Sequence, residues 1–107
     1  MESLLAALTP IETALLPNYP NPFNPETWIP YRLADDADVQ ISIYDGRGIL
    51  VRQLDVGRQP AGHYIDRGRA AYWDGRNEHA ETVASGVYFY QLSTSDYAHM
   101  RRMVVVK

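Results

Sequence analysis

The chain has 107 residues, which gives room for one domain with one hydrophobic core. Hydrophobic residues make up 46% and charged residues 21%, and the net charge of -3 gives no electrostatic reason to expect nucleic acid or an anionic membrane as partner. The lack of cysteine excludes disulfides and thiolate metal sites, and no apolar run approaches the roughly 18–20 residues of a membrane helix.

The beginning of the chain differs in pattern from the rest. We expect residues 1–14 to form a linker that contains a short helix over residues 3–9, with Ser3 as N-cap and Pro10 ending the helix. The stretch MESLLAALTP lacks the basic start and the long apolar run of a secretory signal. If the domain is exported, we therefore expect the signal to lie elsewhere on a larger parent protein.

The stretch NYPNPFNPET at positions 18–27 combines three prolines and three asparagines with two aromatic rings. Proline lacks the amide N–H that helices and interior strands require, so the stretch is not regular structure. Because proline also restricts φ, the stretch is suited to a stiff ribbon over a sheet edge, with Tyr19 and Phe23 as buried anchors. A proline-rich ligand for an aromatic groove is less favoured, because PxxP with flanking basic residues is missing.

Short strands follow from position 27. TWIPYRL (27–33) reads as an edge strand because of Pro30. DVQISIY (38–44) alternates, which predicts Val39, Ile41 and Ile43 inward and Gln40 and Ser42 outward. DGRG (45–48) is a hairpin turn, and ILVRQLD (49–55) is the returning strand. A loop then leads into a strand near Tyr64, and RAAYW (69–73) forms another.

The second half of the chain supplies the remaining strands. Asp74 and Gly75 open a turn and a surface loop, VYFYQL (87–92) is a strong strand, and YAHMRRMVVVK (97–107) is the final one. For VYFYQL the inward set is either Val87 and Phe89 or Tyr88, Tyr90 and Leu92. In the final strand we expect the core to receive Met100, Met103 and Val105, with Arg101 and Arg102 near solvent. About seven short strands predict an all-β sandwich.

No catalytic or metal-binding pattern is strong. Ser85 lacks a G-x-S-x-G frame, and the three histidines lack partners at diagnostic spacing. Oxygen-bearing side chains gather in one loop at Asp74, Asn77 and Glu81, but the order of a calcium loop is missing, so Asp74 is favoured as a turn cap. Eight tyrosines and two tryptophans leave open a stacking platform for carbohydrate, which would need three exposed coplanar rings on one face. We expect no cofactor.

Several blocks together resemble a known family. LLPNYPNPFNPETWIPYRL, VQISIYDGRG, YWDGRNEHAETVASGVYFYQL and RRMVVVK look like the C-terminal sorting domains of type IX secretion substrates and the related immunoglobulin-like domain of the flagellar hook-capping protein. The resemblance implies that residues 15–107 form an immunoglobulin-like (fibronectin III-like) antiparallel β-sandwich. Two positions depart from the family pattern: Ala80 stands where a glycine is usual, and Arg102 stands where a lysine precedes the methionine.

The resemblance also implies a function. The chain is expected to be a non-catalytic C-terminal module of a larger exported protein, secreted or at the cell surface, and read by secretion or surface-attachment machinery. It is expected to be a monomer that contacts upstream domains of its parent, without nucleic acid and without membrane insertion. The alternative is an accessory domain that binds carbohydrate or protein. The residues expected to matter for structure or recognition are Tyr19, Phe23, Trp73, Asp74, Gly75, Gly86, Tyr88, Arg101, Arg102 and Lys107.

Overall fold

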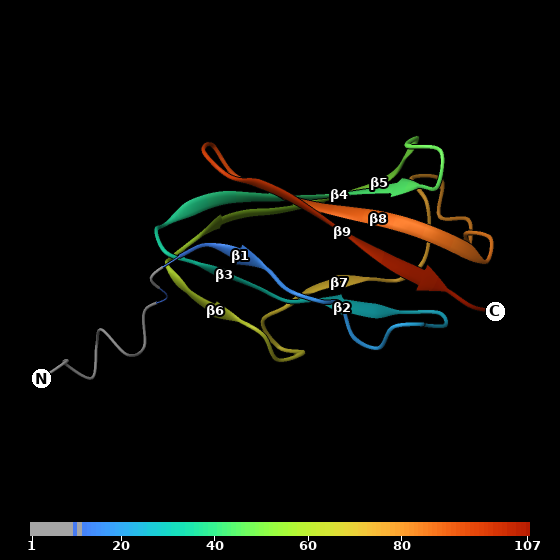
Figure 1. The fold of residues 1–107 in the computed structure, drawn as a ribbon, viewed down its shortest axis with the longest axis horizontal. Helices are drawn as coiled ribbons and strands as arrows, with labels where there is room; N and C mark the ends of the chain where they lie inside the picture. Colours follow the sequence, from blue (N-terminus) through green and yellow to red (C-terminus); the bar gives the residue numbers. More distant parts are fainter. Residues whose placement is uncertain (1–9, 11) are drawn as a thin grey trace, which may run out of the picture.

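Two layers of β-strands face each other in the computed structural model, which describes Pro10 and residues 12–107 (Figure 1). The helix expected over residues 3–9 lies outside the described residues. One layer is a four-stranded sheet, and the other consists of a three-stranded and a two-stranded sheet. The strands are β1 (Ala14–Leu15), β2 (Thr27–Ile29), β3 (Tyr31–Leu33), β4 (Ala37–Asp45), β5 (Leu50–Gln59), β6 (Gly62–Tyr64), β7 (Ala71–Trp73), β8 (Gly86–Ser93) and β9 (Ala98–Val105).

The four-stranded sheet has the order β5-β4-β8-β9, and all its neighbours are antiparallel. Its first hairpin is closed by the predicted DGRG turn. The carboxylate of Asp45 accepts hydrogen bonds from the backbone amides of Arg47 and Ile49 at 2.9 and 3.0 Å, and Gly48 takes a φ of 85°. Side-chain capping and a permissive glycine therefore form this turn, as the sequence indicates. The predicted strands that correspond to β4 and β5, and the hairpin between them, are confirmed.

The second layer divides at Pro30. The predicted strand 27–33 is two strands, because β2 pairs with β7 while β3 pairs with β6 and β1. Proline has no N–H to continue a ladder, so the chain changes partner there. Residues before 15 also contact this layer, since Ala14 pairs with Arg32 and the hydroxyl of Thr13 accepts a hydrogen bond from the Ala34 amide at 3.0 Å.

The core lies between the layers, and β8 supplies its centre. Tyr88, Tyr90 and Leu92 point inward, which settles the alternation that the sequence left open, while Val87 is 41% exposed. The inward residues predicted for β4 are buried, but so is Ser42, which we predicted to face solvent. Ser42 lies on the outer face in a central strand, where its two cross-strand neighbours, Gln53 and Gln91, flank its small side chain.

Two predictions for β9 are wrong. Met103 and Val105 are buried as expected, but Met100 is 44% exposed. Successive side chains of a strand point to opposite faces, so Met100 cannot share a face with Met103. Arg101 does share that inner face, and it is half-buried with its Nε donating to the Leu15 carbonyl at 2.8 Å. Arg102 is exposed, as predicted.

The stacked rings of Tyr31 and Tyr64, 4.8 Å apart, predict a loss of stability in alkaline solution. Burial, with a smaller effect of Tyr64, raises the pKa of Tyr31 from 10.0 to about 12. The unfolded chain therefore loses this proton first, so the stabilisation is complete below about pH 10 and is lost as the pH rises toward 12. We expect the melting temperature to fall across this range, and to fall less in Tyr31→Phe. Circular dichroism at stepped pH measures both slopes, and equal slopes would contradict the assignment to Tyr31.

Candidate functional site

The proline-rich ribbon at 18–27 pairs with the end of β9. The Phe23 amide donates to the Val104 carbonyl at 3.1 Å, and the Val106 amide donates to the Phe23 carbonyl at 3.0 Å. The Val104 amide donates to the Asn21 side chain at 2.9 Å. The Phe23 ring is buried and meets the Trp73 ring edge-on at 5.6 Å. The ribbon therefore covers the free edge of β9 near its end and inserts one aromatic anchor into the core.

Tyr19 is only half-buried, unlike the deep anchor that we predicted. It pairs with Trp28, so both rings lie on the outer face of the β2–β7 sheet, and its hydroxyl donates to the Ile65 carbonyl. The buried residue is its neighbour Asn18, whose backbone amide donates to the Tyr90 hydroxyl at 2.9 Å and whose side-chain amide donates to the Thr27 hydroxyl at 3.0 Å. The only signal in the sequence that could have drawn attention to Asn18 is the number of asparagines in the ribbon.

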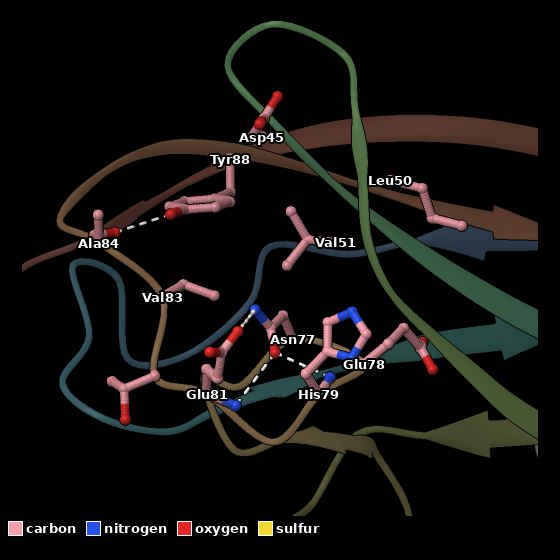
Figure 2. Close-up of a pocket in the computed structure, with 11 residues that line it drawn as sticks. Asp45, Leu50, Val51, Asn77, Glu78, His79, Glu81, Val83, Ala84 and Tyr88 are labelled. Atoms are coloured by element: carbon pink, nitrogen blue, oxygen red, sulfur yellow. Dashed lines mark hydrogen bonds between the residues drawn. The ribbon is translucent and has the colours of Figure 1, made fainter.

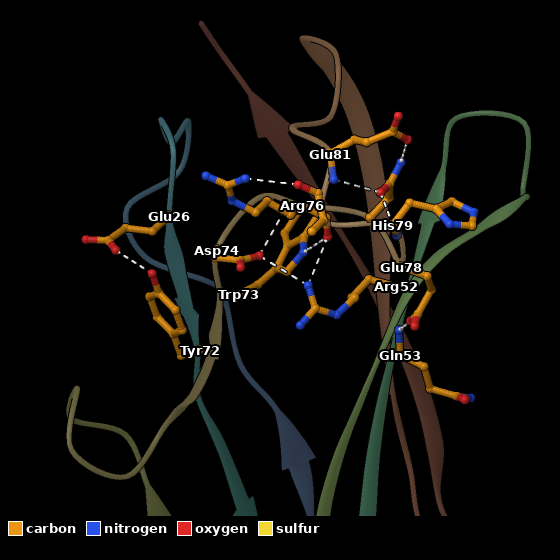
Figure 3. A network of polar contacts seen from close by, with 12 residues as sticks. Glu26, Arg52, Gln53, Tyr72, Trp73, Asp74, Arg76, Glu78, His79 and Glu81 are labelled. Carbon is orange, nitrogen blue, oxygen red and sulfur yellow. Dashed lines mark hydrogen bonds and ion pairs between the residues drawn. The ribbon is translucent and has the colours of Figure 1, made fainter.

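The turn after β7 is built around Asp74 (Figure 3). Its carboxylate accepts from the Arg76 amide at 3.0 Å and pairs with Arg52 at 3.2 Å. The buried Trp73 donates its indole N–H to the Arg76 carbonyl at 2.9 Å, so the turn is tied to the core. Gly75 has a φ of 77°, and a Cβ there would lie 2.2 Å from the Pro25 carbonyl oxygen. Asp74 thus acts as the turn cap, and Gly75 allows the ribbon to approach.

The rest of this loop protects the other edge of the four-stranded sheet. The Glu78 amide donates to the Val51 carbonyl at 3.1 Å. The Glu78 carboxylate accepts from the Gln53 amide at 2.7 Å (Figure 3). Both Val51 and Gln53 belong to β5. The loop therefore takes the place of a further strand beside β5.

The oxygens considered for calcium are used inside the loop. The side-chain oxygen Oδ1 of Asn77 accepts from the backbone amides of His79 and Glu81 at 2.9 and 3.0 Å, and the Asn77 side-chain NH2 group donates to the Glu81 carboxylate at 3.0 Å. Asp74 is engaged with Arg52 and Arg76, as described above. Among residues 10 and 12–107, no group of three or more His, Asp or Glu side chains is placed to hold a metal ion. These side chains shape the loop.

At Ala80 we expect a substitution by glycine to stabilise the fold. This alanine is exposed and has a φ of 63°, a region in which alanine is strained and glycine is not. We expect Ala80→Gly to raise the free energy of unfolding by about 0.5–1 kcal/mol, although glycine usually destabilises. Ala84→Gly is the matched control, because Ala84 is exposed in the same loop without a positive φ, and it should lower stability. Urea unfolding measures both, and a loss in both variants would contradict the strain at Ala80.

A cleft of about 600 Å³ opens between the β4–β5 turn and this loop (Figure 2). Its apolar lining includes Val51, Val83 and Tyr88, and Glu78 and Glu81 contribute carboxylates. The Tyr88 hydroxyl donates to the Ala84 carbonyl at 2.8 Å, and burial raises the pKa of Tyr88. No hydrogen bond between a nucleophile and a base is formed by the described residues that line it. The lining of the cleft is thus mixed, with apolar side chains beside two carboxylates.

Comparison with family models gives a match over residues 26–97 to the FlgD Ig-like domain. The chain belongs to this family. The FlgD Ig-like family confirms the expected sandwich, and residues 26–97 cover the strands from β2 to β8 and end directly before β9. A comparison with curated proteins gives no match.

Solved structures with the same fold include a component of a type IX secretion system. The chain is similar to a domain of dimeric latent PorU from Porphyromonas gingivalis, with 21% identity, a TM-score of 0.62, and coverage of 88% of this chain and 9% of that one. It is similar to PorZ, an essential surface component of the type IX secretion system of the same organism, with 22% identity, a TM-score of 0.59, and coverage of 88% and 12%. FlgD from P. aeruginosa gives 18% identity, a TM-score of 0.54, and coverage of 91% and 67%. The chain thus spans about a tenth of the PorU and PorZ chains.

Three rings lie on the outer face of the β2–β7 sheet of this FlgD Ig-like domain. Tyr19 and Trp28 are 6.3 Å apart and inclined by 21°, and Trp28 and Tyr72 are 5.5 Å apart and inclined by 52°. The Arg67 guanidinium lies over the Trp28 ring at 4.3 Å. A stacking platform for sugar would need coplanar and equally exposed rings. These three rings are neither coplanar nor equally exposed.

The remaining predicted residues of the FlgD Ig-like domain lie along the last two strands. Gly86 begins β8 opposite Val105, and the Lys107 amide donates to the Ser85 hydroxyl at 3.1 Å. Arg102 stands on the outer face of the sheet opposite Phe89. Among the described residues the ion pairs involve Arg47, Arg52 and Arg58, and none includes Arg102. Among the described residues, Arg102 thus forms no ion pair with the loop around Asp74.

Proposed function

We propose that this domain is a non-catalytic C-terminal module of a larger exported protein, and that secretion or surface-attachment machinery reads it as a folded shape. The single observation that carries the proposal is the joint between the ribbon and β9, at Phe23, Val104 and Val106. A receptor that tests this joint tests whether the whole sandwich has closed. Membership of the FlgD Ig-like family and the fold shared with PorU and PorZ support the proposal.

The proposed parent protein is much larger than the domain. The PorU and PorZ chains that share the fold are about ten times as long as the matched part, so upstream domains are expected partners. We propose residues 1–14 as the connection to them and residues 15–107 as the sorting-type domain. On this proposal the mature protein is secreted or held at the cell surface. In line with a recognition role, the side chains of Asp74 and Asn77 are engaged in hydrogen bonds that build their loop.

The proposal is tested by fusing the domain to a cargo protein in a host that has type IX secretion. Deletion of residues 103–107 removes the buried Met103 and Val105 and the pairing with Phe23, so export of the cargo should be lost. Gly48→Ala is the control, because it strains an exposed turn and leaves the joint intact, and it should be exported. Normal export of the deletion would refute the sorting role.

A further inference from the structure

One stretch of the β9 edge has no backbone pairing among the described residues, although β1 lies nearby, where the Leu15 amide donates to the Tyr97 hydroxyl and the Leu15 carbonyl accepts from Arg101. The amide and the carbonyl of Val104 both point away from β8, because they bond with Asn21 and Phe23. Backbone groups of an antiparallel strand alternate in direction every second residue, so those of Arg102, Met100 and Ala98 point the same way. Within residues 10 and 12–107, no strand or bridge pairs with this side of β9 before Val104. An open edge therefore runs from Ala98 to Arg102.

The opposite edge of the same sheet is protected where this one is not. On β5, Val51 and Gln53 are covered by Glu78, and the strand then has a bulge in its pairing with β4 near Gly57, whose φ is 90°. Bulges and covering loops are means by which proteins block the addition of foreign strands. The β8–β9 register runs without a shift over all eight pairs, and residues 98–102 contain no proline. The edge of β9 is thus straight and able to pair.

The chemistry of this edge is basic and apolar. Arg102 is exposed and has no ion pair among the described residues, and Met100 lies on the same face with 44% exposure. Val87 and Val106, at 41% and 48%, extend the apolar part of that face. Residues 97–107 contain no carboxylate to neutralise Arg102. A strand that adds here would gain from one acidic and one apolar side chain, two residues apart.

We propose that the open edge Ala98–Arg102 binds an extended segment of a partner protein as an added strand, with an acidic side chain beside Arg102 and an apolar one beside Met100. This rests on the proposed function, since it names the kind of segment that the machinery presents. Main-chain hydrogen bonds to Met100 and Arg102 provide affinity in such binding, and the alternating side chains provide specificity.

A second copy of the chain fits this edge poorly. Antiparallel pairing of two β9 edges about Met100 would bring Arg101 and Arg102 of each copy beside His99 and Ala98 of the other. A parallel pairing would place arginine against arginine. With no acidic residue in 97–107, either arrangement gathers four arginines along one short ribbon. Like charges placed opposite each other in a sheet destabilise the parallel arrangement. The antiparallel arrangement gathers the same charges without an acidic partner, so charge complementarity favours an acidic segment over a second copy.

The direct test is amide hydrogen exchange of the whole chain with a synthetic probe. The probe is a capped peptide of about eight residues in which threonine occupies every second position and valine and glutamate alternate at the positions between, so that one valine and one glutamate lie two residues apart on one face; the control peptide has lysine in place of glutamate. In the free domain the amides of Met100 and Arg102 should exchange fast, while that of Met103 is slow. The glutamate peptide should slow Met100 and Arg102 by about tenfold or more, and the lysine peptide should not. No change at these amides, or equal protection by both peptides, would overturn the proposal. Protection that rises with domain concentration alone would assign the edge to a second copy and would also overturn it.

Two variants separate this inference from the sorting role. Met100→Pro removes an outward N–H without breaking the β8 ladder and should weaken peptide binding by about tenfold. Arg102→Glu should do the same through charge and cannot disturb the core, which makes the test independent of any folding defect in the first variant. Arg58→Glu, an exposed reversal on β5, is the matched control and should bind normally. If the 103–107 deletion blocks export while both edge variants bind the glutamate peptide normally and are exported normally, the edge proposal fails and the sorting role stands.

Discussion

Replacing Phe23 with alanine should lower the free energy of unfolding by about 3–5 kcal/mol. The ring is buried beside Trp73, so its removal leaves a cavity where the ribbon meets the core. The backbone bonds of residue 23 to Val104 and Val106 are unaffected by the side chain, so the loss reports packing alone. Urea unfolding at equilibrium, followed by tryptophan fluorescence, measures it.

Phe23→Leu is the matched control for this prediction. Leucine refills most of the volume but loses the edge-on contact with Trp73, so we expect a cost of about 1–1.5 kcal/mol. If alanine at position 23 cost no more than leucine, the ribbon would be a linker that lies on the surface, and its role in closing the sandwich would have to be abandoned.

The second large effect is expected at Gly75. Alanine there would place Cβ 2.2 Å from the Pro25 carbonyl oxygen, a backbone atom that cannot rotate away, and the φ of 77° adds strain. We expect Gly75→Ala to cost about 2–5 kcal/mol through both effects. Thermal and urea unfolding measure the loss.

Gly48→Ala isolates the strain from the clash. Gly48 has a similar φ of 85°, but a Cβ there would meet nothing within 4 Å. Its substitution should therefore cost only the conformational term of about 1–2 kcal/mol. Equal losses at the two glycines would show that the ribbon can move away from the turn, and that the Pro25 contact does not fix its position.

Local pattern was sufficient for the sandwich, the β4–β5 hairpin and the turn at Asp74. Strand alternation and turn chemistry act within a few residues, so a single sequence carries them. Pattern was insufficient in β9, where methionines at positions 100 and 103 both read as core although their spacing puts them on opposite faces. The strict period of two, applied to Met103 and Val105, would have placed Met100 outside.

Contacts between distant segments could not be predicted from one sequence. The half-buried position of Arg101 depends on the Leu15 carbonyl, and the burial of Asn18 depends on the Tyr90 hydroxyl. These partners are 86 and 72 residues apart, and no local pattern links them. The open edge of β9 is likewise visible only once the ribbon is seen to stop at Val104.

The pairing of the ribbon with β9 also has a consequence for the time at which the domain folds. Asn21 and Val104 are 83 residues apart, so their bond forms only after every residue between them has been synthesised. Contacts of such long range require costly loop closure and are characteristic of slow folding. A nascent chain that lacks β9 leaves Phe23 without its partner and keeps the ribbon unattached. Slow, late closure of this kind leaves a newly made protein with an open sandwich for some time. That period ends when residues 104–106 pair with the ribbon.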